Sequence, residues 1–130
     1  MSELNRHVLV VDDDFIIVMG LIAQVEELGL TVCGSASTAD QAVDMARLHR
    51  PMLVLMDMRL DGAKDGVDAA LAIYEEIGSK VIFLTGSREP STVVRINQDH
   101  PSAILFKPVS GLQLRNAISA AIGLGASAPI

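Results

Sequence analysis

The feature that most constrains the fold is a regular alternation between short apolar runs and longer segments of helical periodicity. The runs are rich in β-branched residues, which is typical of strands buried on both faces of a parallel sheet. They lie at 7–11, 31–34, 52–56, 80–84 and 102–106. Segments with helical spacing follow each of them, at 14–28, 37–50, 67–77, 90–99 and 110–122.

This alternation predicts a (βα)₅ chain. Right-handed crossovers between buried parallel strands favour a doubly wound α/β sheet with helices on both faces. With 130 residues and no linker or internal repeat, the chain is expected to form one domain over residues 1–130. We expect its core to span about 7–123, and the small residues of 124–130 to fray as a tail.

Composition and charge exclude several classes of protein. The net charge of −6 argues against a nucleic-acid binder, which would normally present a basic face. Cys33 is the only cysteine, so an intrachain disulfide and a cysteine zinc site are excluded. The longest apolar run, Phe15 to Ala23, is too short to cross a membrane, and the polar first residues show no secretory signal. We therefore expect a soluble, cytoplasmic protein that does not bind membranes.

Polar side chains follow four of the predicted strands. The first strand ends in Asp12-Asp13-Asp14, the third in Asp57, the fourth in Thr85 and the fifth in Lys107. Each has an ordinary explanation alone, and Asp14 is well placed to cap the following helix. Ligands of open parallel sheets, however, bind at the carboxyl ends of the strands. The conjunction therefore predicts a site at that edge.

The residue types at this edge point to phosphoryl chemistry. Crowded carboxylates repel one another and raise one another's pKa unless a cation is present. Mg²⁺ suits a site with a few carboxylates and several waters. One carboxylate can then act as a nucleophile and form an aspartyl-phosphate. Lys107 would neutralise one phosphoryl oxygen, and the Thr85 hydroxyl would donate a hydrogen bond to another.

Four segments carry a resemblance to a known family. In order along the chain, Val8–Asp14, Leu53–Asp57, Phe83–Gly86 and Phe106–Pro108 resemble the motifs of the receiver domain of two-component response regulators. The resemblance covers nearly the whole chain, from residue 7 to about 123. It implies a flavodoxin-like fold with strand order 2-1-3-4-5.

The resemblance also implies a role for each matching residue, and a cis peptide bond between Lys107 and Pro108. The implied roles are Asp57 as phosphoacceptor, Asp12 and Asp13 as the acidic pair that binds Mg²⁺ together with Asp57, the Arg59 backbone carbonyl as a further ligand, Thr85 as the switch hydroxyl and Lys107 as the phosphate-pairing lysine. The chain would then be a signalling phosphoacceptor that promotes its own phosphorylation and dephosphorylation, and not an enzyme in the usual sense.

The chain departs from the family pattern at three places. Many receivers have an aromatic three residues before the lysine, where this chain has Ile104. Ser87 and Arg88 follow the fourth-strand motif, where a subgroup of receivers has another aromatic. The usual coupling between the Thr85 hydroxyl and an aromatic rotamer is therefore not expected. In the loop after Asp57, Met58-Arg59 replaces the common Met-Pro of the family, and Arg59 either pairs with the phosphoryl group or is a solvated arginine.

The resemblance implies a histidine kinase or phosphotransfer protein as partner. We expect no output domain, and hence a stand-alone receiver whose output is a protein contact or phosphate disposal. The first helix carries a second apolar stripe away from the sheet. We expect Phe15, Met19 and Ile22, with Pro108, to form the partner surface. The alternatives are a neutral patch or a homodimer, so the chain is expected to be a monomer or weak homodimer.

Three competing functions remain open. The first is a receiver fold that serves as a phosphorylation-independent adaptor. The second is a haloacid-dehalogenase-type phosphatase with Asp12 as nucleophile and Asp14 as general acid. The third is a flavodoxin-like cofactor binder, which three aspartates in place of a phosphate-cradling loop disfavour.

Overall fold

The structure is a computed structural model that describes residues 6–123, and over these residues five strands alternate with five helices as predicted. The strands are β1 (His7–Val11), β2 (Thr31–Ala36), β3 (Leu53–Asp57), β4 (Lys80–Thr85) and β5 (Ala103–Phe106). The helices are α1 (Phe15–Glu27), α2 (Ala39–His49), α3 (Gly66–Glu76), α4 (Pro90–Asn97) and α5 (Gly111–Ile122). The expected tail at 124–130 lies outside the described residues.

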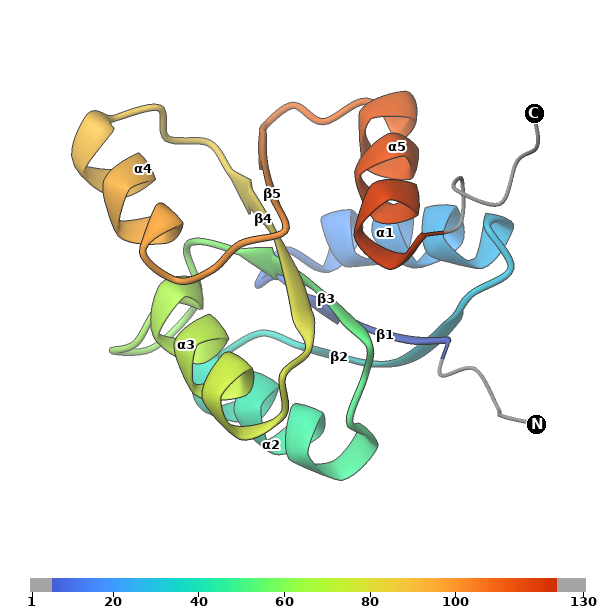
Figure 1. The fold of residues 1–130 in the computed structure, drawn as a ribbon, viewed down its shortest axis with the longest axis horizontal. Helices are drawn as coiled ribbons and strands as arrows, with labels where there is room; N and C mark the ends of the chain where they lie inside the picture. Colours follow the sequence, from blue (N-terminus) through green and yellow to red (C-terminus); the bar gives the residue numbers. More distant parts are fainter. Residues whose placement is uncertain (1–5, 124–130) are drawn as a thin grey trace.

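The strands form one parallel sheet in the order β2-β1-β3-β4-β5, which confirms the predicted topology. Helices α1 and α5 cover one face, whereas α2, α3 and α4 cover the other (Figure 1). Because all five strands run in the same direction, their carboxyl ends lie along one edge. That edge carries the residues that the sequence singled out.

Local hydrogen bonds set the helix boundaries. The Asp14 side chain accepts hydrogen bonds from the backbone N–H groups of Ile16 and Ile17, at 2.9 and 3.3 Å, so its predicted capping role is confirmed. Helix α3 begins with a capping box between Asp65 and Asp68. Such reciprocal bonds satisfy backbone donors that a helix start leaves unpaired.

Strand β2 extends two residues beyond the predicted range, to Ala36. It is an edge strand that pairs with β1, and Ala36 lies opposite Val11. A strand with one neighbour does not need an apolar side chain at every position, so apolar continuity under-predicts its length.

The core consists of two apolar layers, one on each side of the sheet. Every residue of β3 is buried, which explains its unbroken apolar run up to Asp57. On α1, Val18, Leu21 and Val25 are buried against the sheet. Phe15 and Met19 are 71% and 52% exposed. The helix therefore has one face in the core and an apolar face in solvent.

Ile22 is less exposed than Phe15 and Met19, and its place on the partner surface stays a prediction. Its side chain is half-buried and packs against the core layer under α1 and α5. It lies one turn after Val18, so the two residues share nearly the same helical direction.

Gly66 is packed directly against the backbone of β3. A Cβ atom at this position would lie 2.0 Å from the backbone oxygen of Asp57, and its amide donates a 2.8 Å hydrogen bond to the Met58 carbonyl. The first residue of α3 can therefore approach the end of β3 only because it has no side chain.

We predict that Gly66→Ala destabilises the protein by about 1–3 kcal/mol, because the new methyl group overlaps the backbone of Asp57. Helix propensity alone would favour alanine. Gly20→Ala, in α1, is the control, since nothing lies within 4 Å of its Cβ position. Gly20→Ala should stabilise the protein by about 0.5–1 kcal/mol. Urea unfolding checks both, and equal effects at the two positions would contradict the packing argument.

Asp99, just after α4, is a buried acid. It is 3% exposed, and neither of its carboxylate oxygens has a hydrogen-bond partner within the described part of the chain. Burial raises its pKa to about 6, against the opposing influence of the positive groups of His100 and Arg95. The neighbouring His100 ring stacks on Tyr74 of α3, with ring centroids 4.2 Å apart.

Because the pKa of Asp99 is raised on folding, the folded state binds its proton more tightly than the unfolded state does. The free energy of unfolding should therefore fall as pH rises from about 4 to about 7. We predict that Asp99→Asn flattens this part of the pH profile and stabilises the protein at neutral pH by roughly 1–3 kcal/mol. Urea unfolding across this range is the measurement. An unchanged slope would show that another group causes the dependence.

Candidate functional site

Three carboxylates meet at the carboxyl edge of the sheet. One oxygen each from Asp12, Asp13 and Asp57 can be chosen so that all lie within 4.8 Å of one another. Asp12 and Asp57 are buried, whereas Asp13 is exposed. The Asp12 side chain is held in place by the Asp14 amide, which donates a 2.9 Å hydrogen bond to it. The cluster is therefore fixed on two strand ends and open to solvent on one side.

Lys107 reaches this cluster from the segment after β5. Its Nζ donates to Asp57 Oδ1 at 3.0 Å and to Asp12 Oδ2 at 3.4 Å. Its backbone amide donates to the Thr85 carbonyl at 2.8 Å, which fixes the lysine to the end of β4. The peptide bond to Pro108 is cis, as the family resemblance implied. Lys107 is thus a positive group aimed at Asp57.

The electrostatics of the site are dominated by burial. Burial raises the pKa of Asp57, with further raising by Asp12 and Asp13 and an opposing influence from Lys107. Burial alone would lower the pKa of Lys107, but its contacts with Asp57 and Asp12 outweigh that effect and raise it. Three carboxylates thus face one nearby ammonium.

This donor set fits a hard divalent cation. Mg²⁺ prefers carboxylate and carbonyl oxygens and keeps several waters, which the exposed side at Asp13 would admit. Asp12, Asp13 and Asp57 are the residues that would hold it. Arg59 is exposed on the loop after β3, and the part of its backbone carbonyl in metal binding stays a prediction.

Thr85 ends β4 and is buried. Its Oγ1 accepts a 3.0 Å hydrogen bond from the Ser87 amide. The Ser87 hydroxyl in turn contacts Thr92 of α4 at 3.5 Å. In the sequence, Ser87 is notable only because it stands where some receivers have an aromatic residue. The short polar Thr-Gly-Ser run is a turn signal that would have indicated this contact.

The two positions that lack the family's aromatics are filled differently. Ile104 is half-buried and packs against the core layer under α2 and α3. The Arg88 guanidinium lies over the Phe106 ring, 4.2 Å from its centroid. The loop after β4 is therefore stacked onto β5 by a cation–π contact.

Asp14 lies in the cap of α1, where its carboxylate accepts two backbone hydrogen bonds. A general acid must hold a proton for the leaving group, whereas this carboxylate is used as an acceptor. The phosphatase alternative, which needs Asp14 as acid, gains no support from this geometry.

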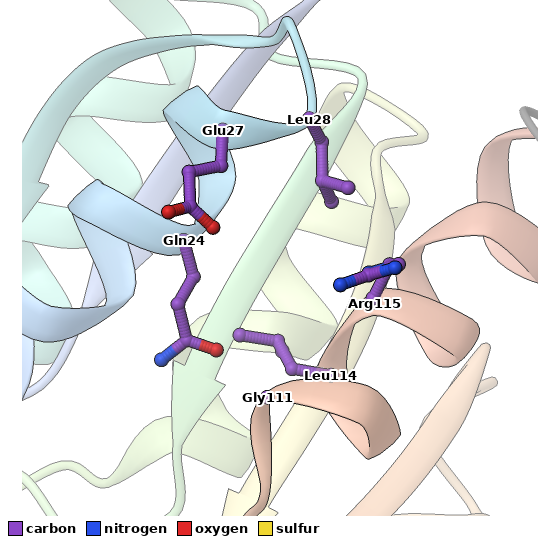
Figure 2. Close-up of a pocket in the computed structure, with 6 residues that line it drawn as sticks. All are labelled: Gln24, Glu27, Leu28, Gly111, Leu114 and Arg115. Carbon is purple, nitrogen blue, oxygen red and sulfur yellow. The ribbon is translucent and has the colours of Figure 1, made fainter.

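Two depressions lie between α1 and the carboxyl-terminal part of the fold. A groove of about 560 Å³ runs between α1 and the segment after β5, and Lys107 contributes to its lining. Its other lining residues are Ile17, Gly20, Leu21, Gln24, Leu84, Pro108 and Val109. A second pocket, of about 350 Å³, opens between α1 and α5, and Figure 2 shows Glu27 and Arg115 on its two sides. Across the described residues, none of the helices has the length and apolar character of a membrane span.

Comparisons with known proteins identify the family of the chain. The family model of the response regulator receiver domain matches residues 8–119. Transcriptional regulatory protein PdtaR of Mycobacterium tuberculosis is 34% identical over 121 residues, which are 93% of this chain and 58% of PdtaR. Phyllosphere-induced regulator PhyR of Methylorubrum extorquens is 30% identical over 122 residues, 93% of this chain and 45% of PhyR. The chain thus spans about half the length of these relatives.

Solved structures show the same fold. The signal receiver domain of a modulated diguanylate cyclase from Desulfovibrio desulfuricans aligns with a TM-score of 0.84 at 33% identity, covering 92% of this chain and 95% of that one. The receiver domain of PhyR from Erythrobacter litoralis aligns with a TM-score of 0.82 at 29% identity, covering 97% and 96%. With the matched family model spanning most of its length, the chain belongs to the response regulator receiver domain family.

Proposed function

We propose that the protein accepts a phosphoryl group on Asp57 in a Mg²⁺-dependent reaction, from a histidine kinase or a phosphotransfer protein. The observation that carries the proposal is the placement of Lys107 Nζ against both Asp57 and Asp12, beside the open carboxylate of Asp13. A buried nucleophile, a positive group and a cation-binding pair then lie within one small volume.

In this reaction an Asp57 oxygen attacks phosphorus while the bond from phosphorus to the donor's imidazole nitrogen breaks. The donor keeps the electron pair of that bond and takes up a proton. Bound Mg²⁺ would neutralise charge on the phosphoryl oxygens. Lys107 orients Asp57 before attack and pairs with a phosphoryl oxygen afterwards. The Thr85 hydroxyl donates to another phosphoryl oxygen while its Oγ1 accepts from Ser87.

We propose that the donor docks on the exposed apolar face of α1. Phe15 and Met19 project from this helix, and the groove that Pro108 helps to line runs beside it towards Lys107. Exposed apolar side chains near a reactive group are typical of a protein-binding site. A donor helix on this face would bring its phosphohistidine to Asp57.

We propose that the chain acts as a single receiver domain, with a core over about 7–123, working in the cytoplasm. Its output would be a protein contact or the disposal of phosphate, as monomer or weak homodimer. A phosphorylation-independent adaptor remains the second candidate. The observation that favours it is Ile104, packed into the core where an aromatic switch would stand.

We predict that acetyl phosphate with Mg²⁺ adds one phosphoryl group to the protein and none to Asp57→Asn, because the amide is not a nucleophile. Lys107→Gln should keep the cation site but react more slowly, since it lacks the positive charge against Asp57. Intact mass spectrometry over time measures both.

The control is Asp14→Asn, which changes a neighbouring carboxylate that caps α1. It should react as the wild type does. An adduct that survives in Asp57→Asn and is lost in Asp12→Asn would instead support the phosphatase. No adduct in the wild type with any small donor would favour the adaptor.

We predict that Met19→Ser slows phosphoryl transfer from a phosphorylated histidine kinase fragment by roughly fivefold or more, as expected for loss of a central apolar contact. The rate with acetyl phosphate should not change, because Met19 does not touch the site. Leu48→Ser is the matched control, since Leu48 is an exposed apolar residue of α2 on the opposite face. Equal slowing by both variants would contradict docking on α1.

A further inference from the structure

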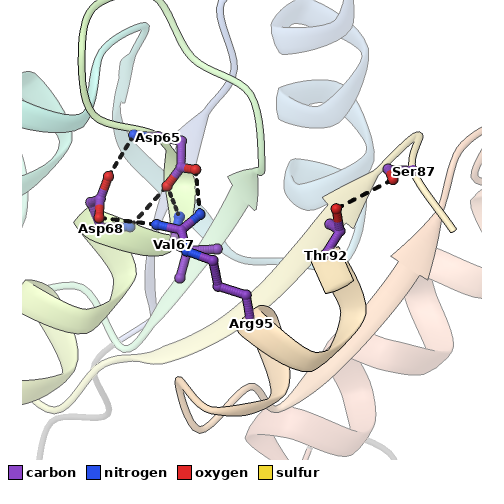
Figure 3. A network of polar contacts seen from close by, with 6 residues as sticks. All are labelled: Asp65, Val67, Asp68, Ser87, Thr92 and Arg95. Carbon is purple, nitrogen blue, oxygen red and sulfur yellow. Dashed lines mark hydrogen bonds and ion pairs between the residues drawn. The ribbon is translucent and has the colours of Figure 1, made fainter. Parts of the chain in front are cut away.

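The side chain of Arg95 connects helix α4 to the start of α3. Arg95 donates a hydrogen bond from each of two guanidinium nitrogens, one to Asp65 and one to Asp68 at 3.1 Å (Figure 3). Asp65 also caps α3 by accepting from the Val67 and Asp68 amides. Burial alone would raise the pKa of Asp65, but Arg95 and these amides hold it below its ordinary value.

This attachment lies at the end of the loop that follows the acceptor. Asp65 closes the segment 58–65, which begins next to Asp57. The Gly66 amide donates to the Met58 carbonyl at 2.8 Å, so the two ends of the segment are held together. Arg95 therefore binds the last residue of the 58–65 segment that follows Asp57.

A second contact joins the other end of α4 to the switch hydroxyl. The Ser87 amide donates to Thr85 Oγ1, and the Ser87 hydroxyl contacts Thr92 (Figure 3). The Glu89 amide donates a 3.2 Å hydrogen bond to the Ser87 hydroxyl as well. A change in the position of Thr85 is thus passed through Ser87 to the first turns of α4.

Apart from these polar contacts, α4 is held lightly. Of its eight residues only Ile96 is buried, and its first turn has no side-chain cap. A helix with so little buried apolar surface can shift at low cost. The polar contacts of Thr92 and Arg95 therefore contribute much of what keeps α4 in place.

We propose that Arg95 is a positioning residue: its pairing with Asp65 and Asp68 latches α4 in the unphosphorylated arrangement, in place of the aromatic switch that the chain lacks. The proposal rests on Asp57 being the phosphoacceptor. When Thr85 turns to the phosphoryl group, Ser87 draws the start of α4 with it, and the latch opposes this shift. Opening the latch and phosphorylation therefore favour the same arrangement, and each must promote the other.

The test uses beryllofluoride with Mg²⁺ as a mimic of the phosphoryl group. NMR of backbone amides follows occupancy near Asp57 and the response of α4 separately. Arg95→Gln should bind beryllofluoride roughly two- to fivefold more tightly than the wild type. Its α4 amide shifts without ligand should already lie on the path towards the liganded positions. Arg95→Lys, which keeps the charge but not the forked geometry, should fall between the two.

Arg47→Gln is the matched control. Arg47 of α2 makes a forked pair with Glu76 of α3 at 2.8 and 3.0 Å, an equivalent bridge between helices that does not touch α4. It should lower stability as much as Arg95→Gln and leave the beryllofluoride affinity unchanged. If both variants changed the beryllofluoride affinity and the α4 amide shifts alike, a general loosening of the fold would be the cause and the latch would be overturned.

The two proposals fail in different ways. If the wild type shows neither a beryllofluoride response nor a phosphoryl adduct, the proposed function fails and the latch with it. If the wild type responds while Arg95→Gln has the same affinity and the same α4 shifts, the proposed function stands and the latch is overturned.

Discussion

The structure depends on a charge balance at the carboxyl edge of the sheet. Two buried carboxylates, Asp12 and Asp57, would be costly to desolvate without a positive partner, and Lys107 lies within hydrogen-bond distance of both. The contact also ties the segment after β5 to the ends of β1 and β3. With Asp13 nearby, the charge at this edge remains negative, so the arrangement still attracts a cation.

Most of the fold could be predicted because its signals are local. Apolar runs mark β1, β3 and β4, since strands buried on both faces need apolar side chains at successive positions. The main members of the site were predictable for a related reason. In a parallel sheet every strand ends at the same edge, so the residue after each apolar run is placed without knowledge of packing.

The features that could not be predicted depend on partners distant in the sequence. Arg95 meets Asp65 across 30 positions, and no local pattern marks an arginine on a short helix as a bridge. The buried state of Asp99 depends on how the end of α4 packs. The half-burial of Ile22 was not evident from the sequence, because a stripe drawn on a helix does not show how wide an arc its neighbours cover. Local chemistry thus locates the site, and tertiary packing decides how it is connected.

The stack between Tyr74 and His100 has an optical consequence. The chain has one tyrosine and no tryptophan, so Tyr74 dominates its near-ultraviolet absorption and emission. The ring lies on α3, and its stacking partner directly follows Asp99 beyond α4. A motion that separates these two helices would change the surroundings of this one chromophore. The protein therefore carries a native spectroscopic reporter at the junction between α3 and α4, with no label required.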